Sequence, residues 1–355
     1  RAHLGLRPCA THCNSLSYYP ERELMASEHG DRVTTSSPVP NQGSGEAAGR
    51  IARWSGAADA ASNRPSKLFR VFAWLNAIGN LVIIGTGGAV RLTGSGLGCP
   101  TWPLCSETSW IPTDELTGHA LIEFGNRLMS PVLAILAVAM VLLAWTWRTR
   151  RRDLWALSLT ILLGVVAQAI VGGITVLTKL NAWIVGGHYL ISAALVGVGT
   201  ALVLASRHDG APRPLSGPAW LSGLGVLAAL LLATLLTIGV FTTGNGPHSG
   251  DAGIVRNQEL WNSLAHIHAW VAYALTAVMG ILFIATLSLR LWRSFRAVIA
   301  IIVLLVVQIA VGIIQANTGL PPLLVGVHMV LAGLSVAAIV YLHESRYVAP
   351  TPLTD

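Results

Sequence analysis

The chain contains the segment AQAIVGGITVLTKLNAWIVGGHYLISA (Ala167–Ala193), and a related segment, VQIAVGIIQANTGLPPLLVGVHMVLAG (Val307–Gly333), follows it. Each consists of two apolar runs joined by a short turn, which is the pattern of two helices that pack side by side. Four pairs of residues recur at one offset of 140 positions (308 − 168): Gln168 and Gln308, Gly172 and Gly312, Gly186 and Gly326, and His188 and His328. The sequence therefore indicates an internal duplication of a helical unit.

The composition is that of an integral membrane protein. Hydrophobic residues make up 53% of the 355 residues, charged residues make up 11%, and the mean hydropathy is +0.61, far from the average soluble protein. A helix needs about 20 apolar residues to cross the hydrocarbon core of a bilayer. Eight segments meet this requirement, near residues 70–90, 120–147, 154–177, 183–205, 219–241, 262–289, 297–316 and 323–343. We therefore expect an all-α membrane protein with eight transmembrane helices.

The duplication divides these eight helices into two halves. The segment AVRLTGSG at Ala89 parallels GVFTTGNG at Gly239, and each follows the first helix of a half. Because four helices is an even number, both halves have the same orientation in the membrane. The predicted fold is two pseudo-symmetric four-helix bundles related by an axis along the membrane normal, an N-terminal bundle over 67–206 and a C-terminal bundle over 207–346, with 347–355 as a tail.

Positive charge gathers in alternate loops, which is typical of the cytoplasmic side of a membrane protein. These basic residues are Lys67, Arg70, Arg148, Arg150, Arg151, Arg152, Arg207, Arg213, Arg290, Arg293, Arg296 and Arg346, whereas the opposite side carries Arg91, Lys179 and Arg256. Both termini are therefore predicted to be cytoplasmic. The loop bias also accounts for the net charge of +7, and no nucleic-acid-binding fold surrounds these residues, so we exclude nucleic acid as a partner.

The first 66 residues differ from the rest of the chain. They are rich in Ser, Pro, Gly and charge and lack helical periodicity, so they are predicted to be disordered. We expect residues 1–24, which precede the first methionine, Met25, not to belong to the native protein, and we assign them no function.

Three histidines lie at a matched depth in the helices of even number. His188, His268 and His328 each lie one to two turns inside their helix, and Asn126 lines up with His268 at an offset of 142 (268 − 126). Ionisable residues within membrane helices are rare and usually mark a site. Paired histidines on facing helices are the arrangement that holds a bis-histidine haem. We therefore expect His268 and His328 to bind haem iron.

The pattern of these histidines is also compatible with two other roles. Each could donate a single hydrogen bond between helices and nothing more. A zinc site would need a third or fourth nitrogen or sulfur ligand, and no Cys lies within a helix to supply one. His266, two residues before His268, points away on a helix and is expected at the surface or behind the ligands.

Cys99 and Cys105 lie in the loop GSGLGCPTWPLCSET, on the side predicted to be oxidising. A Cys pair at this position is either a disulfide or a redox-active thiol pair. A zinc site here would be incomplete, since no other Cys or His is adjacent. We predict a disulfide.

Four motifs together resemble the haem A synthase family of aerobic bacteria and mitochondria, in the form with a Cys pair in an outer loop. They are GTGGAVRLTGSGLGCPTWPLC (85–105), IEFGNRLMS (122–130), VGGH (185–188) and VGVH (325–328), and the resemblance covers roughly 68–345. It implies a haem b in the C-terminal bundle and a substrate haem in the N-terminal bundle. It also implies an oxidoreductase that converts the methyl group at carbon 8 of haem O to a formyl group, by successive hydroxylations with oxygen from water, and so supplies haem A to cytochrome oxidase.

The resemblance also implies partners and a location. They are haem O, handed over by a haem O synthase, an electron acceptor outside the chain, and the lipid bilayer of a bacterial plasma membrane.

The resemblance further implies roles for particular residues. His268 and His328 correspond to the ligands of haem b, and His188 to an iron ligand in the N-terminal bundle. Glu123 corresponds to the catalytic carboxylate of the family, which can take up a proton or stabilise developing positive charge. Arg127 is expected to pair with Glu123 or with a haem propionate. The alternative is a purely structural ion pair between Glu123 and Arg127, four residues apart on one helix.

Asn126 departs from the family pattern, which is commonly Glu-x-x-His-Arg. The fourth expected haem ligand is therefore an asparagine, which is a poor ligand for haem iron. Either His188 alone holds the N-terminal haem, leaving it five-coordinate, or His119 replaces the missing ligand. His119 lies seven residues earlier, about 10 Å along the helix, so we favour the five-coordinate haem.

Two other functions remain open. A dihaem protein that carries electrons between a quinone and a periplasmic partner would use the same histidines, but it requires four good ligands. A transporter or haem-handling protein would be supported by the repeat alone. Asn126 and Glu123 favour the synthase over the electron carrier.

Overall fold

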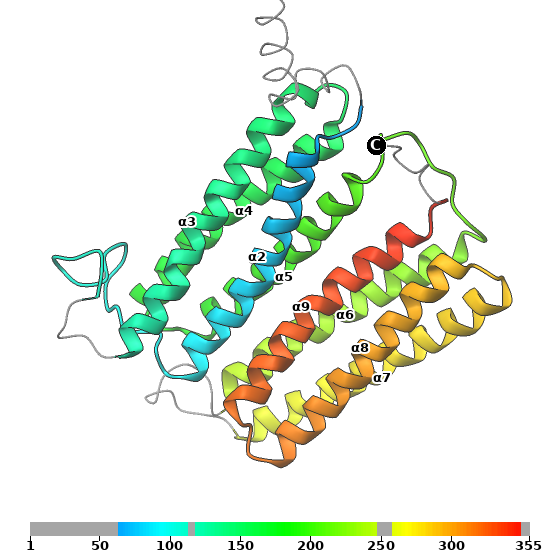
Figure 1. Cartoon of the computed structure of the whole chain (residues 1–355). Coiled ribbons are helices and arrows are strands. Elements are labelled where there is room, and N and C mark those ends of the chain that lie inside the picture. Colours follow the sequence, from blue (N-terminus) through cyan, green and yellow to red (C-terminus); the bar gives the residue numbers. More distant parts are fainter. Residues whose placement is uncertain (1–62, 113–117, 247–257, 349–355) are drawn as a thin grey trace, which may run out of the picture. The chain divides into compact units, whose positions relative to one another are not determined.

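The computed structural model describes residues 63–112, 118–246 and 258–348 (Figure 1). All of them belong to one compact unit of the chain, 49–355. Of the residues 1–66 predicted to be disordered, only 63–66 are described, and there Ser66 Oγ accepts from Phe69 N at 3.2 Å at the start of the first helix. The rest of that segment and the end of the predicted tail, 349–355, lie outside the described residues.

Eight long helices make up the described chain, as predicted, and no strand occurs among the described residues. The helices are α2 (Lys67–Leu92), α3 (Gly118–Ala144), α4 (Arg152–Leu177), α5 (Ala182–Ala205), α6 (Trp220–Asn245), α7 (Gln258–Ser288), α8 (Trp292–Asn317) and α9 (Pro322–Ser345), and a short 3₁₀ turn, η2 (Trp145–Trp147), follows α3. Each of the eight is long and apolar enough to cross a membrane.

Most of the apolar surface of these helices faces outward. In α6, which has a mean hydropathy of 2.5 over its most apolar window, only 11% of that window is buried within the protein. Large side chains such as Ile135, Ile284 and Val306 are more than half exposed. So much exposed apolar surface is stable only against lipid. The protein is therefore a multi-pass protein of the cell membrane.

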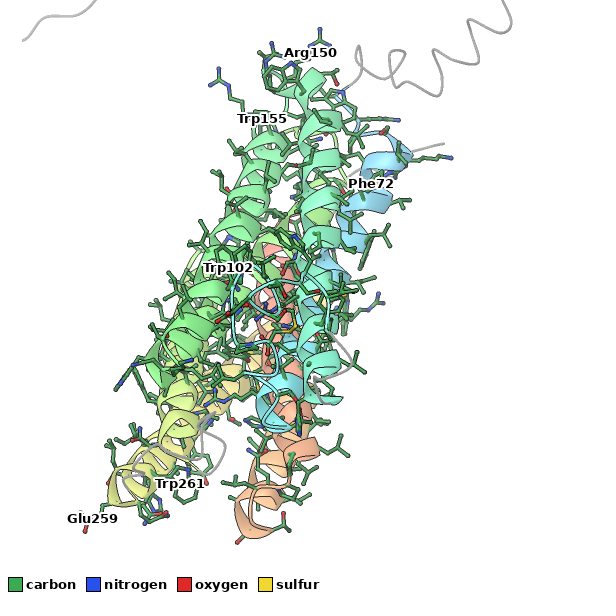
Figure 2. All side chains as sticks on the ribbon, turned by 90° about the vertical axis from the view of Figure 1, so that its left-hand side faces the viewer. Phe72, Trp102, Arg150, Trp155, Glu259 and Trp261 are labelled. Carbon is green, nitrogen blue, oxygen red and sulfur yellow. A yellow bond between two sulfur atoms is a disulfide. The ribbon has the colours of Figure 1, made fainter. Side chains whose placement is uncertain are left out.

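Polar and aromatic residues gather where the helices end. In Figure 2 the labelled Trp155 and Arg150 lie at one end of the molecule, and Trp261 and Glu259 lie at the other. Tryptophan at both ends of a set of spans is the usual aromatic belt at the two membrane interfaces.

The helices pack as two groups of four (Figure 1). In the first group α2 contacts α3 and α5, and α4 contacts the same two helices. In the second group α6 and α8 each contact α7 and α9. The two bundles meet where α9 packs against α2 and α5, and where α5 packs against α6. The axis that relates the two bundles, and the side of the membrane on which the termini lie, stay predictions.

The turns within the duplicated segments repeat their local geometry. Lys179 and Leu180 have positive φ angles of 53° and 60°, and Gly319 and Leu320, 140 positions later, have 78° and 59°. Leu180 N donates to the carbonyl of Thr175, and Leu320 N donates to that of Gln315, both at 2.8 Å. The sequence repeat therefore encodes the same helix ending twice.

Each bundle has a packed half and a hollow half. In the first bundle the apolar core is formed by the beginnings of α2 and α4 and the ends of α3 and α5, and it includes Phe69, Met140 and Leu154. In the second bundle the core is formed by the beginnings of α6 and α8 and the ends of α7 and α9, and it includes Leu221, Met279 and Leu282. We call the end of the molecule where α3, α5, α7 and α9 begin the disulfide end, because it carries Cys99 and Cys105. The cavities lie toward this end.

Candidate functional site

Each bundle contains a cavity lined by described residues. The N-terminal cavity has a volume of about 400 Å³ and lies among α2, α3, α4 and α5. The C-terminal cavity has a volume of about 390 Å³ and lies among α6, α7, α8 and α9. Their volumes and mostly apolar linings fall in the range of sites for small molecules and cofactors.

The predicted ligand residues line these cavities. His268 and His328 line the C-terminal cavity, and Asn126 and His188 line the N-terminal cavity. His266 is exposed and is not part of either lining. The structure thus brings the four residues together in two pairs, one in each bundle.

Each of the four side chains lies against a glycine of a neighbouring helix. A Cβ atom added to Gly172 would lie 3.4 Å from the His188 ring, one on Gly239 would lie 3.0 Å from the His268 ring, and one on Gly312 would lie 3.5 Å from the His328 ring. A Cβ atom on Gly87 would lie 3.7 Å from Asn126 Oδ1 in the same way. Asn126 therefore occupies the position that a histidine fills in the other three cases.

The two histidines of the C-terminal cavity are spaced as a metal-bound pair. The ring centres of His268 and His328 lie 6.4 Å apart. Two imidazoles that bind one metal ion from opposite sides, each at about 2.0–2.1 Å, have ring centres roughly 6 to 6.5 Å apart. The pair fits a single iron between its rings.

Hydrogen bonds fix the helices that carry these ligands, but not the rings themselves. Gln168 Nε2 donates to the carbonyl of His188 at 2.9 Å, and Gln308 Nε2 donates to that of His328 at 3.2 Å. Ring atom Nδ1 of both histidines is buried without a hydrogen-bond partner among the residues that the structure describes. Buried polar atoms normally have a partner, so these rings fit a role that the protein atoms alone do not complete.

Asn126 is held by α2. Thr86 Oγ1 donates to Asn126 Oδ1 at 2.7 Å. His119, the other residue considered as an N-terminal ligand, is exposed, does not line the cavity, and has its Nδ1 2.8 Å from Ser95 Oγ. The geometry gives no support to His119 as a replacement ligand.

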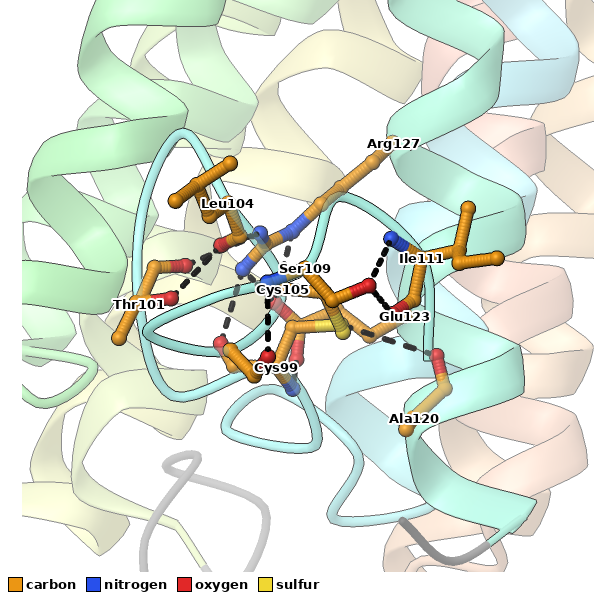
Figure 3. The surroundings of a disulfide bond; sticks show 10 residues. Cys99, Thr101, Leu104, Cys105, Ser109, Ile111, Ala120, Glu123 and Arg127 are labelled. Carbon is orange, nitrogen blue, oxygen red and sulfur yellow. Dashed lines mark hydrogen bonds and ion pairs between the residues drawn. A yellow bond between two sulfur atoms is a disulfide. The ribbon is translucent and has the colours of Figure 1, made fainter. Parts of the chain in front are cut away.

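Glu123 and Arg127 form an ion pair that anchors the loop before α3 (Figure 3). Glu123 Oε1 accepts from Arg127 Nη2 at 2.5 Å, and Oε2 accepts from Cys99 N at 2.8 Å. Arg127 also donates to the carbonyls of Cys99, Thr101 and Leu104. Arg127 lines the N-terminal cavity, whereas Glu123 is 4% exposed and does not.

The anchored loop closes the N-terminal cavity. Cys99 and Cys105 form the predicted disulfide, and both are fully buried. Trp102, Pro103 and Trp110 of this loop line the cavity. A Cβ atom on Gly173 of α4 would lie 2.5 Å from the Trp102 ring, so only glycine permits this close approach. The disulfide thus belongs to the lid of the cavity.

Three residues line both cavities and form a wall between them, which we call the shared wall: Arg91, Tyr189 and Met329. Tyr189 Oη donates to the carbonyl of Met329 at 3.0 Å, which joins α5 to α9. Arg91 reaches from α2 toward the carbonyl of Thr243 on α6, at 3.5 Å. Sequence reasoning counted Arg91 only as a loop charge and missed this wall. The sequence feature that could have indicated the shared wall is that Tyr189 directly follows His188 and Met329 directly follows His328.

Haem fits the residues present. The C-terminal cavity offers a histidine pair at the spacing of a shared metal, and the glycines beside the rings leave room for them. The N-terminal cavity offers one histidine opposite an amide. Among the described residues no group of three His, Cys, Asp or Glu side chains gathers as a structural zinc site would require.

Comparison with known proteins agrees with this arrangement. Residues 70–340 match the family model described as cytochrome oxidase assembly protein. Over 132 residues, 37% of this chain, the chain is 34% identical to the haem A synthase of Geobacillus kaustophilus, and this match spans 41% of that relative's length. The haem A synthase of Listeria monocytogenes is 25% identical over 279 residues, which are 75% of this chain and 89% of the relative.

A third relative, the haem A synthase of Halalkalibacterium halodurans, is 26% identical over 265 residues, which are 70% of this chain and 87% of the relative. The family match spans both cavities and the eight helices, apart from the first three residues of α2 and the last five of α9. The chain belongs to the haem A synthase family of cytochrome oxidase assembly proteins.

Proposed function

We propose that this protein is a haem A synthase, an oxidoreductase that converts the carbon 8 methyl group of haem O to a formyl group by successive hydroxylations with oxygen from water. The observation that carries the proposal is the difference between the two cavities. One offers a histidine pair 6.4 Å apart, and the other offers a single histidine opposite an asparagine. One site is built for permanent iron ligation and the other for a group that must enter and leave.

The C-terminal cavity would hold haem b through His268 and His328. A haem held by these two histidines would supply electron transfer. Gln308 steadies the His328 backbone, and Gly239 and Gly312 leave room for the two rings.

The N-terminal cavity would hold haem O as substrate, with His188 as its iron ligand. The lid would close over the substrate after it enters, because Trp102, Pro103 and Trp110 line the cavity. Arg127 holds the lid by donating hydrogen bonds to the carbonyls of Cys99, Thr101 and Leu104. A closed lid excludes bulk water from the reacting carbon. Arg127 and Arg91 line this cavity and supply positive charge for the haem carboxylates.

Each of the two hydroxylations adds an oxygen atom from water and releases two electrons and two protons, and the geminal diol that results loses one water molecule to leave the formyl group. The iron of the bound haems supplies the redox chemistry. Haem b in the C-terminal cavity would supply electron transfer, and the shared wall of Arg91, Tyr189 and Met329 lies between the two cavities. The final electron acceptor would lie outside the chain. The family resemblance predicts that Glu123 takes up a proton, whereas its contacts with Arg127 and Cys99 N favour the anchoring role described above.

The proposal is tested by identifying the haem that the protein makes. The full chain is expressed in a host that makes haem O but not haem A, and the haem is extracted and identified by chromatography and mass. Haem A or its hydroxylated precursor, together with haem B, is the expected result. Haem B alone, with a spectrum of six-coordinate iron, would contradict it and favour an electron carrier.

Matched variants assign the two cavities. His268→Ala is expected to remove haem B from the purified protein. His188→Ala is expected to leave haem B in place and to abolish haem A. If both variants lose haem B equally, the assignment of one haem to each bundle is wrong.

A further inference from the structure

We propose that the N-terminal cavity takes a small ligand with a hydrogen-bond-accepting atom, of the size of hydroxide, on the side of the bound haem opposite His188, and that Thr86 orients the Asn126 amide to bind it. The inference rests on the proposed function, because it requires a haem in this cavity. It concerns what completes the iron site, which the family match does not address.

Asn126 occupies a ligand position without being able to bind iron. Its contact with Gly87 repeats the contacts of the three histidines with Gly172, Gly239 and Gly312. An asparagine side chain is one bond shorter than the path to imidazole Nε2, so space remains between it and a haem held by His188. An amide nitrogen in that position can donate a hydrogen bond but cannot ligate the metal.

The residue that precedes the glycine in the chain differs between the Asn126 position and the three histidine positions. It is Val171, Ile238 or Val311 before the glycines that contact a histidine, and Thr86 before the glycine that contacts Asn126. Threonine has nearly the shape of valine and adds one hydroxyl group. Thr86 and Asn126 therefore form a matched polar pair at the one position of four where the imidazole is missing.

Thr86 decides which end of the amide faces the cavity. Its hydroxyl lies 2.7 Å from Asn126 Oδ1 and 3.3 Å from the carbonyl of Ile83. A hydroxyl has one proton, and the shorter contact places it on Asn126 Oδ1. The amide oxygen is then occupied, and Nδ2 has no hydrogen-bond partner among the residues that the structure describes. The amide presents a donor to the cavity that it lines.

This arrangement selects the chemistry of the ligand. Arg91 and Arg127 are the charged residues among those that line the N-terminal cavity, and the charge of Arg127 is balanced by Glu123. A donor amide and the positive charge of Arg91 favour a small anion or a diatomic molecule with an acceptor atom. Hydroxide meets these requirements, and water is the oxygen source in the proposed reaction.

Cyanide is the probe for this site. The full-length ferric protein, loaded with both haems, is titrated with cyanide while absorption and EPR spectra are recorded. We expect one of the two haems to bind cyanide in the wild type. Thr86→Val removes the hydroxyl at nearly constant shape and Asn126→Leu removes the amide, and each is expected to weaken cyanide binding about tenfold. Asn126→His is expected to abolish it and to give a second six-coordinate haem.

Two control variants keep the test decisive. Thr86→Ser retains the hydroxyl and is expected to retain wild-type affinity. Ile238→Thr places a hydroxyl at the counterpart position of the C-terminal bundle and is expected to leave the cyanide affinity unchanged. The proposal is overturned if the wild type carries both haems and binds no cyanide, or if Thr86→Val binds it as tightly as the wild type.

The two proposals fail separately. Wild-type protein that makes haem A, with a Thr86→Val variant of unchanged cyanide affinity, would overturn the ligand site and leave the synthase intact. Wild-type protein that binds cyanide in the expected Thr86-dependent manner and makes no haem A would overturn the synthase and leave the ligand site.

Discussion

At the scale of single residues, the protein accommodates the two buried charges of Glu123 and Arg127 by pairing them with each other. Glu123 and Arg127, with side chains 5% and 19% exposed, satisfy each other and the backbone of the lid. A buried charge that loses its partner costs about 3–5 kcal/mol. The ion pair therefore fixes the lid strongly, and Glu123 acts either on the substrate or on the lid.

We predict that Glu123 acts mainly by positioning the lid. Glu123→Gln keeps an acceptor for Cys99 N but removes the charge that holds Arg127, so the lid should loosen. The expected result is faster reduction of the Cys99–Cys105 disulfide by an external thiol, together with lower haem A formation. Arg127→Gln breaks the same pair and should change both readouts to a similar degree.

A different pattern would establish the catalytic role. If Glu123→Gln abolishes haem A formation with an unchanged rate of disulfide reduction, while Arg127→Gln remains active, then the carboxylate takes part in the chemistry. Retention of haem B by both variants checks that the C-terminal bundle is intact.

At the scale of elements, the eight helices were predictable and their ends were less so. A run of about 20 apolar residues has few alternatives to a membrane helix. The predicted span 297–316 nevertheless begins at Trp292 in the structure, because its first turn carries Arg293, Ser294 and Arg296, which lower the local hydropathy without breaking the helix. Hydropathy locates the part of a helix that lies in lipid, but it does not locate the residue at which the helix begins.

The side-chain pairs within the site depend on packing and could not be predicted from the chain. Thr86 and Asn126 lie 40 positions apart, and Arg91 and Thr243 lie 152 apart. No local pattern marks such pairs. The histidines were predictable because membrane depth follows directly from position in a span, and because the repeat supplies a second copy for comparison.

The loop that joins the two bundles contains a pH-sensitive contact. His208 follows α5, its Nδ1 accepts from Gly210 N at 3.1 Å, and its Nε2 lies 3.3 Å from Arg213 Nη2. Burial, together with the charges of Arg213 and Arg151, lowers the pKa of His208 from the ordinary value of 6.5, against the opposing effects of Glu344 and Asp153. The folded loop therefore favours neutral His208.

This contact predicts a pH dependence of stability. A histidine whose pKa is lowered on folding contributes fully above the pKa of the unfolded chain, and the contribution is lost as the pH falls toward the folded pKa. Thermal unfolding in detergent should therefore show a melting temperature that falls as the pH is lowered below 6.5. His208→Gln keeps a polar side chain without a titrating group and should show a smaller fall. Equal falls in the two proteins would contradict the prediction.

At the scale of the whole molecule, the two bundles share more than a contact surface. Tyr189 and Met329 lie next to His188 and His328 in the chain, and a hydrogen bond from Tyr189 Oη to the Met329 carbonyl joins them across the boundary. Arg91 lines both cavities with them. A duplicated bundle therefore became a two-site molecule in which the sites have a common wall.

Arg91 is predicted to influence both haem sites at once. Histidines aside, it is the sole ionisable cation among the described residues that line the C-terminal cavity, and it also lines the N-terminal one. A nearby positive charge stabilises the reduced form of a haem and pairs with its carboxylates. Arg91→Gln should therefore lower the reduction potentials of both haems, by an amount on the order of tens of millivolts, in a redox titration of the purified protein.

The charge-conserving variant separates electrostatics from packing. Arg91→Lys keeps the charge in a side chain with fewer donors, so its potentials should stay closer to those of the wild type. If Arg91→Gln shifts the potential of only one haem, then Arg91 serves that cavity alone and the shared wall does not couple the sites. If Arg91→Lys shifts both potentials as far as Arg91→Gln does, then the geometry of the guanidinium, and not its charge, is what the two sites share.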